Sequence, residues 1–141
     1  MMRSFGPALA LAATVAVGAA CRESGPNPDN VLPFGFLDSP ANGAAVARVT
    51  RVAGWALDDG RVSRVDVYVD GRFAGSSTPG VLRPDLVTAY PAYPDAARGG
   101  WELAVDLGER EGGRHILAQA VDDQGATRDI GTASVTVAGR P

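Results

Sequence analysis

Apolar and polar side chains alternate along this chain with a period of two, and this pattern constrains the fold more than any other feature. Three valines alternate with Asp66 and Tyr68 over residues 65–69, and residues 101–107 alternate in the same way, with Trp101, Leu103, Val105 and Leu107 on one face. Successive side chains of a β-strand point to opposite faces, so each segment predicts a strand with one buried face. No stretch after residue 30 has a convincing apolar repeat at helical spacing. The chain is therefore expected to be all-β.

Turn residues divide the chain into short strands. Asp70-Gly71 is the clearest hairpin signal, because both central positions of a type I′ turn need positive φ. We expect strands around Phe34 and Phe36 and over residues 46–57, 65–69, 72–76, 101–107, 116–120 and 134–137. About seven short strands separated by Gly, Asp and Pro turns are typical of an antiparallel β-sandwich.

Several short motifs lie at residues 39–43, 54–58, 65–71 and 113–115, and in the Ala-x-Ala-x-Asp-x-x-Gly pattern at 118–125. Together they resemble the bacterial Ig-like domains that occur as repeats in secreted and surface proteins. The resemblance covers about residues 36–137. It implies an Ig-like antiparallel β-sandwich over residues 33–138, and a spacer, adhesion or recognition role without catalysis.

The N-terminal segment predicts export. Arg3 precedes an uncharged apolar run over residues 5–17, which is too short to span a bilayer, and small residues follow up to Cys21. A cysteine at this position resembles the lipobox of bacterial lipoproteins. The resemblance implies that residues 1–20 are removed as a signal peptide, that Cys21 is lipidated and that the membrane is a partner. In that family Arg22, rather than Asp, favours the outer membrane. The alternative is an ordinary secretory signal and a secreted or periplasmic product.

The rest of the composition narrows the function. Residues 22–32 are polar and rich in proline, so we expect a flexible linker there. The net charge of −3 argues against a nucleic-acid partner. With a single histidine, His115, and a single cysteine, the chain lacks the three or four ligands that zinc needs. No catalytic motif is present, so an enzyme is not expected.

Residues 78–100 form a longer connection than the other turns, and long loops on rigid sandwiches often carry recognition. Its candidate ligand-binding residues are Arg83, Asp85, Tyr90 and Tyr93. The alternative, which we favour, is that Arg83 and Asp85 pin the loop by an ion pair while the two tyrosines cover the edge of the sandwich.

Two functions follow from these observations. The first is a non-enzymatic, membrane-tethered interaction or structural module of the cell envelope, whose partner is an envelope protein or a glycan. The second is a carbohydrate-binding module, which needs a row of exposed aromatic side chains, for which the candidates are Tyr68, Tyr90, Tyr93 and Trp101. We favour a role for Trp55 and Trp101 in the core or at an edge over a sugar platform.

Paired aspartates in two turns raise the question of a metal. In an Ig-like topology, both turns lie at the same end of the sandwich, which would bring together Asp58, Asp59, Asp122 and Asp123. Calcium prefers such oxygen ligands. The alternative is that Asp58 and Asp122 cap their turns by accepting hydrogen bonds from backbone N–H groups, while the other two are solvated. We favour this alternative and therefore expect no cofactor. A weak calcium site is the hypothesis to test.

Overall fold

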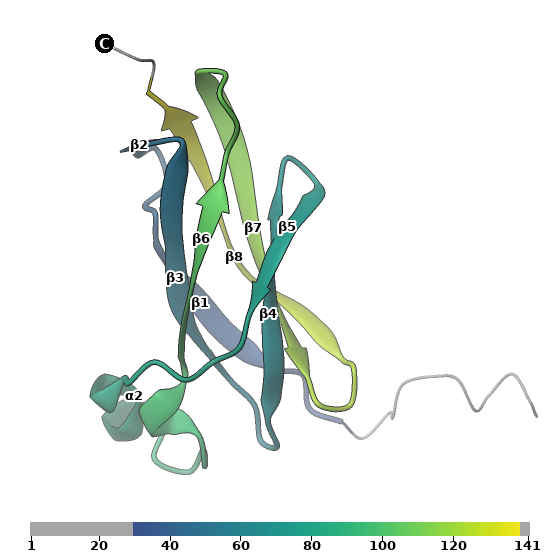
Figure 1. Cartoon of the computed structure of the whole chain (residues 1–141). Coiled ribbons are helices and arrows are strands. Elements are labelled where there is room, and N and C mark those ends of the chain that lie inside the picture. The colour runs from purple at the N-terminus through teal and green to yellow at the C-terminus, as the bar shows by residue number, and fades with distance from the viewer. Residues whose placement is uncertain (1–29, 139–141) are drawn as a thin grey trace, which may run out of the picture.

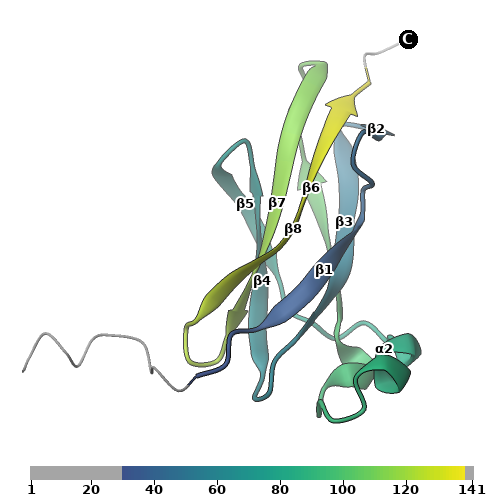
Figure 2. The same cartoon turned by 180° about the vertical axis from the view of Figure 1, so that it is seen from behind.

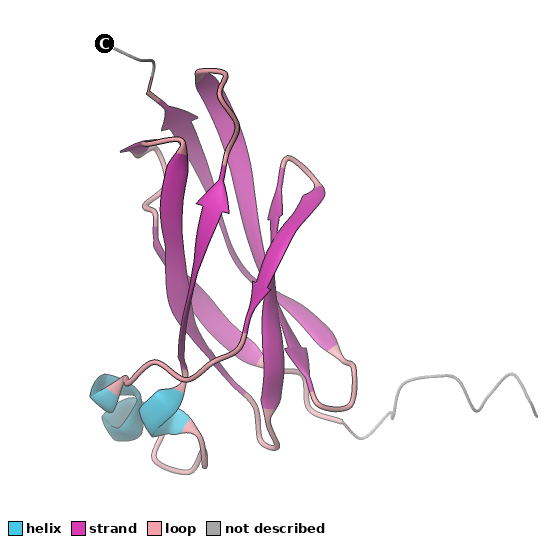
Figure 3. Ribbon diagram, in the orientation of Figure 1, coloured by secondary structure: helices cyan, strands magenta, loops and turns pink. Residues whose placement is uncertain are grey.

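The structure, a computed structural model, describes residues 30–138 and forms two packed β-sheets (Figures 1 and 3). The predicted signal peptide, Cys21 and most of the predicted linker lie outside the described residues. One sheet has the strand order β1-β3-β6 and the other β2-β8-β7-β4-β5. The strands are β1 (Phe34–Ser39), β2 (Ala45–Val46), β3 (Val49–Leu57), β4 (Val62–Val69), β5 (Arg72–Ser77), β6 (Gly100–Asp106), β7 (Gly112–Asp122) and β8 (Thr127–Val137). The predicted all-β sandwich is confirmed.

The core lies between the two sheets and is built from the alternating side chains of the sequence. Val65 and Val67 of β4 are fully buried, and they pack with Trp101 of β6 and Ile116 of β7. The β4–β5 turn has the expected geometry, since Asp70 and Gly71 have φ angles of 50° and 81°. The apolar strand faces that the alternation predicts are therefore the faces that are buried between the two sheets.

Three details differ from the sequence-based expectation. Eight strands are present in the described residues rather than about seven, because the predicted segment 46–57 divides. β2 pairs with β8 in parallel, whereas β3 joins β1 and β6 in the other sheet, so the chain changes sheets between them. The last strand begins at Thr127 instead of residue 134, and its polar start pairs with β7. An exposed polar run hides such a strand from a hydrophobicity pattern.

The connection between β5 and β6 contains helices that the sequence pattern did not predict. α2 (Pro84–Ala89) starts with a proline in its first turn and has Asp85 there, both common at helix starts, and η1 (Ala96–Arg98) follows. Neither is long enough to show an apolar repeat. Both lie at one end of the sandwich (Figures 1 and 2).

The described chain starts at the end of the sandwich that carries α2, and it finishes at the opposite end (Figure 2). Within residues 30–138 no helix has the length and apolar character needed to cross a membrane.

Candidate functional site

The connection between β5 and β6 packs against the outside of the three-stranded sheet. On β3, Val52 and Ala56 face the main core, so Trp55 and Leu57 face outward. A second small core covers them and is called the outer aromatic cluster here. It consists of Leu57, Leu86 and Ala96, with Phe34, Trp55, Tyr90 and Tyr93 packed against them. The sequence did not indicate this cluster, because its members come from four separate elements of the fold.

The rings of the outer aromatic cluster meet mostly edge to face. The ring centroids of Phe34 are 5.3 Å from those of Tyr90 and 5.2 Å from those of Tyr93, at interplanar angles of 63° and 70°. Tyr90 also lies 5.3 Å from Trp55. This is the arrangement in which aromatic rings stabilise a packed cluster, and it leaves the two tyrosines half-buried rather than presented as a flat surface.

Arg83 fastens the same connection to the sheet. Its Nη1 donates to Asp38 Oδ2 at 2.8 Å, and its Nε and Nη2 donate to the two carboxylate oxygens of Asp85 at 2.9 and 2.8 Å. These hydrogen bonds, first of all the two to Asp85, raise the pKa of Arg83, and those two in turn lower the pKa of Asp85. This geometry matches the favoured alternative, in which the ion pair of Arg83 and Asp85 holds the loop in place.

The four aromatic candidates of the carbohydrate-binding hypothesis do not form one row. Trp101 is 1% exposed and lies between the sheets. Tyr90 and Tyr93 belong to the outer aromatic cluster, whereas Tyr68 is on β4, where its ring contacts Phe73 of β5 at 5.8 Å. Phe73 is 60% exposed. The pair of Tyr68 and Phe73 is therefore a more accessible aromatic surface than Trp101 or the two tyrosines of the outer aromatic cluster.

The two aspartate turns lie side by side, because Asp123 N donates to Arg61 O at 3.0 Å. Asp58 Oδ2 accepts from the N–H groups of Gly60 and Arg61, at 2.9 and 3.0 Å. Asp122 uses Oδ1 in the same way for its own turn, and its Oδ2 accepts from the side chain of Asn30. Both side chains therefore make the capping hydrogen bonds of the favoured alternative.

Burial is the main cause that raises the pKa of Asp58, and the charges of Asp59 and Asp122 add to it. Asp58 is 4% exposed, and its Oδ1 has no hydrogen-bond partner. Within residues 30–138 no group of three His, Cys, Asp or Glu side chains is placed to hold a metal ion. Calcium at these turns stays a prediction of the sequence.

A hollow of about 340 Å³ lies beside Asp58, between the β3–β4 turn and the two ends of the long connection. Its polar lining includes Arg61, Thr78, Asp95 and Arg98. No sequence signal marks this set, because single charged residues in separate turns form no motif.

The bacterial Ig domain family matches residues 33–137. A search of curated proteins found no match. Among solved structures, the fibronectin(III)-like modules of CbhA from Clostridium thermocellum share 24% identity with a TM-score of 0.55, covering 76% of this chain and 99% of the module.

Two further solved structures match with lower TM-scores. CopC from Methylosinus trichosporium OB3b shares 15% identity with a TM-score of 0.44, and the match covers 76% of this chain and 96% of CopC. The family 28 exopolygalacturonase of Yersinia enterocolitica shares 11% identity with a TM-score of 0.45, over 79% of this chain and 21% of the enzyme.

Proposed function

Because the chain belongs to the bacterial Ig domain family, we propose that it is a non-enzymatic interaction or structural module of the cell envelope, tethered to a membrane through lipid on Cys21. The observation that carries the proposal is the family match over residues 33–137, which accounts for nearly all of the described fold. A bacterial Ig-like sandwich fits a structural or binding role.

The spacing between Cys21 and the sandwich supports the tether. β1 begins at Phe34, and the chain is already fixed at Asn30 by its hydrogen bond to Asp122. The residues between Cys21 and Asn30 reach at most roughly 30 Å when fully extended. Lipid on Cys21 would keep the domain close to a membrane surface, with the end that carries α2 nearest the attachment.

Metabolic labelling tests the tether. The full chain and its Cys21→Ser variant are expressed in a Gram-negative bacterium that is fed an alkyne-tagged fatty acid. We expect the wild type to be labelled and to sediment with outer-membrane density, and the variant to be unlabelled and absent from the outer membrane. Mass spectrometry of the wild type should find Cys21 as an acylated first residue. An unlabelled wild type with residues 1–20 removed would instead support the secreted or periplasmic alternative.

A glycan is the alternative partner, and the exposed Phe73 beside Tyr68 is the surface that favours it. A glycan array separates the two functions. Binding that Phe73→Ala abolishes and Tyr93→Phe leaves intact would support carbohydrate recognition on the five-stranded sheet. No binding to any glycan on the array would instead favour a protein partner or a structural role.

A further inference from the structure

The hollow beside Asp58 combines an apolar floor with a polar rim. Ala56, Leu57, Val62 and Pro79 contribute apolar surface, and the first three are buried in the fold. Small-molecule sites usually have this composition, with a few polar groups that fix the orientation of the ligand. The volume of about 340 Å³ is at the small end of such sites. One sugar ring or a small organic acid is therefore the size of ligand that it fits.

Two arginines line the hollow without carboxylate partners. Within residues 30–138, ion pairs are formed by Arg48, Arg51, Arg64 and Arg83, but by neither Arg61 nor Arg98. The one side-chain hydrogen bond of Arg98 is a long one, 3.5 Å from Nη1 to Gly80 O. Both arginines are exposed residues, and their guanidinium groups retain free donors. A guanidinium binds a planar carboxylate through two parallel hydrogen bonds, which makes that group the best match.

Two carboxylates and a hydroxyl complete the lining. Asp95 and Thr78 are exposed, and they offer a carboxylate acceptor and a hydroxyl group. Asp58 is buried, and it contributes negative charge beneath the lining rather than an accessible acceptor. The acidic side chains disfavour a ligand that carries only negative charge. They favour one that also brings hydrogen-bond donors such as hydroxyl groups.

We propose that this hollow binds small hydroxylated carboxylates, the chemistry shared by uronic sugars and hydroxy acids. The carboxylate lies on Arg61 and Arg98, and the hydroxyl groups donate to Asp95. The ring or carbon chain covers the apolar floor. This inference goes beyond the tethered envelope module and does not depend on lipid at Cys21.

Titration of the full chain in detergent tests the proposal by ¹H–¹⁵N NMR. Glucuronate is expected to shift the side-chain signals of Arg61 and Arg98 in the millimolar range, whereas glucose, which lacks the carboxylate, and acetate, which lacks the hydroxyls, bind at least about tenfold more weakly. Lactate separates the two sources of the ligand. Tighter binding of lactate assigns the site to hydroxy acids, and tighter binding of glucuronate assigns it to uronic sugars.

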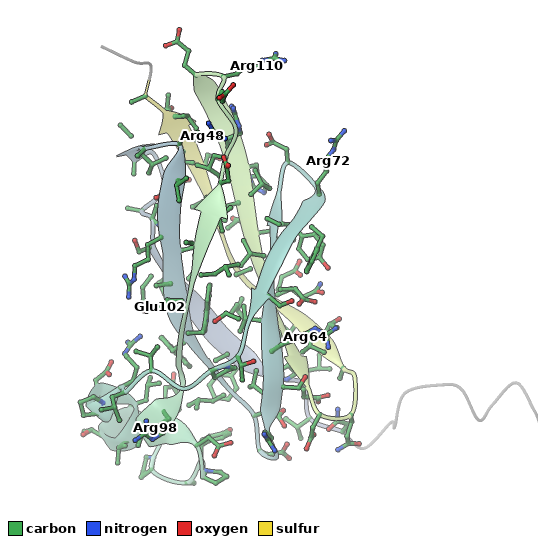
Figure 4. All side chains as sticks on the ribbon, in the orientation of Figure 1. Arg48, Arg64, Arg72, Arg98, Glu102 and Arg110 are labelled. Atoms are coloured by element: carbon green, nitrogen blue, oxygen red, sulfur yellow. The ribbon has the colours of Figure 1, made fainter. Side chains whose placement is uncertain are left out.

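Matched arginine variants localise the effect. Arg61→Gln and Arg98→Gln should each weaken glucuronate binding about tenfold or more. Arg110→Gln removes the same charge at the opposite end of the sandwich and should leave binding unchanged (Figure 4). Unchanged thermal unfolding of all three variants shows that they fold. Equal binding of glucose and glucuronate, no binding of either glucuronate or lactate, or equal weakening by Arg110→Gln would overturn the proposal.

Discussion

Arg83 and Asp38 join two parts of the fold that are 45 residues apart in sequence, with 2.8 Å between Nη1 and Oδ2. Asp38 belongs to β1, and Arg83 immediately precedes α2. The same guanidinium also binds Asp85 with two hydrogen bonds, and its side chain is only 25% exposed. The long connection is therefore fixed to the outer face of the three-stranded sheet instead of extending freely into solvent.

Replacing Arg83 should loosen this connection. Arg83→Met removes both ion pairs from a mostly buried position, and we expect the free energy of unfolding to fall by about 1–2 kcal/mol. Hydrogen exchange should increase over residues 84–98. Arg51→Met is the control, because Arg51 pairs with Glu102 from a 62% exposed position and should cost about 0.5 kcal/mol or less. Equal costs in urea unfolding would contradict the pinning role.

The outer aromatic cluster should depend on the ring of Tyr90 rather than on its hydroxyl. Tyr90→Ala removes ring contacts with Phe34 and Trp55 and should cost about 2–3 kcal/mol, less than a fully buried ring. Tyr90→Phe keeps the ring and should cost less than about 1 kcal/mol. The tryptophan fluorescence of the alanine variant should shift to the red, because Trp55 becomes more exposed. A phenylalanine variant as unstable as the alanine variant would refute this account.

Gly54 should tolerate no side chain. A Cβ at this position would collide with the carbonyl oxygen of Phe36, because β1 and β3 approach closely there. Gly54→Ala is expected to lower the free energy of unfolding by about 1–3 kcal/mol or more. A Cβ at Gly80 meets nothing within 4 Å, so Gly80→Ala should stay within about 0.5 kcal/mol of the wild type. Similar melting temperatures for the two variants would show that β1 can move away from β3.

Asp58 should make stability fall as the pH rises. Burial raises its pKa in the folded state above the unfolded value of about 3.9, so the folded state binds this proton more tightly. The stabilisation is complete below the unfolded pKa, and it is lost as the pH rises through the folded pKa. Denaturant unfolding from about pH 4 to pH 7 should therefore show a flatter profile for Asp58→Asn than for the wild type.

Asp106 provides a control of opposite sign. Its hydrogen bond with Arg48 lowers its pKa to about 2, so its contribution is present above about pH 4 and is lost as the pH falls toward 2. Asp106→Asn should lower the stability by a constant amount above about pH 4 and change the slope of the profile only between about pH 4 and pH 2. Parallel profiles of the wild type and Asp58→Asn above pH 4 would rule out the assignment to Asp58.

The β-sandwich could be predicted from the sequence because each main strand has one buried face. The alternation at Val65, Val67 and Val69 identified β4, and Asp70-Gly71 identified the turn that follows. β2 was hidden because two residues show no periodicity. The polar start of β8 was hidden because its side chains face solvent.

The candidate sites were harder to predict from the sequence, because they depend on which strands and loops contact one another in the fold. The ion pair of Arg83 with Asp85 and the capping hydrogen bonds of Asp58 could be predicted as alternatives. The partners of these residues are only two or three residues away in the sequence. Trp55 and Phe34 come together only when β1 pairs with β3. Arg61 and Arg98 share a hollow only when the long connection folds back across the end of the sandwich.

The parallel pairing of β2 with β8 determines how the domain responds to tension. Backbone hydrogen bonds join this region, among them those from Gly43 N to Ser134 O, from Thr136 N to Ala44 O and from Ala138 N to Val46 O. A pull on the chain before Asn30 and after Ala138 acts in opposite directions along these two strands (Figures 1 and 2). These bonds would then be loaded together in shear instead of opening one after another.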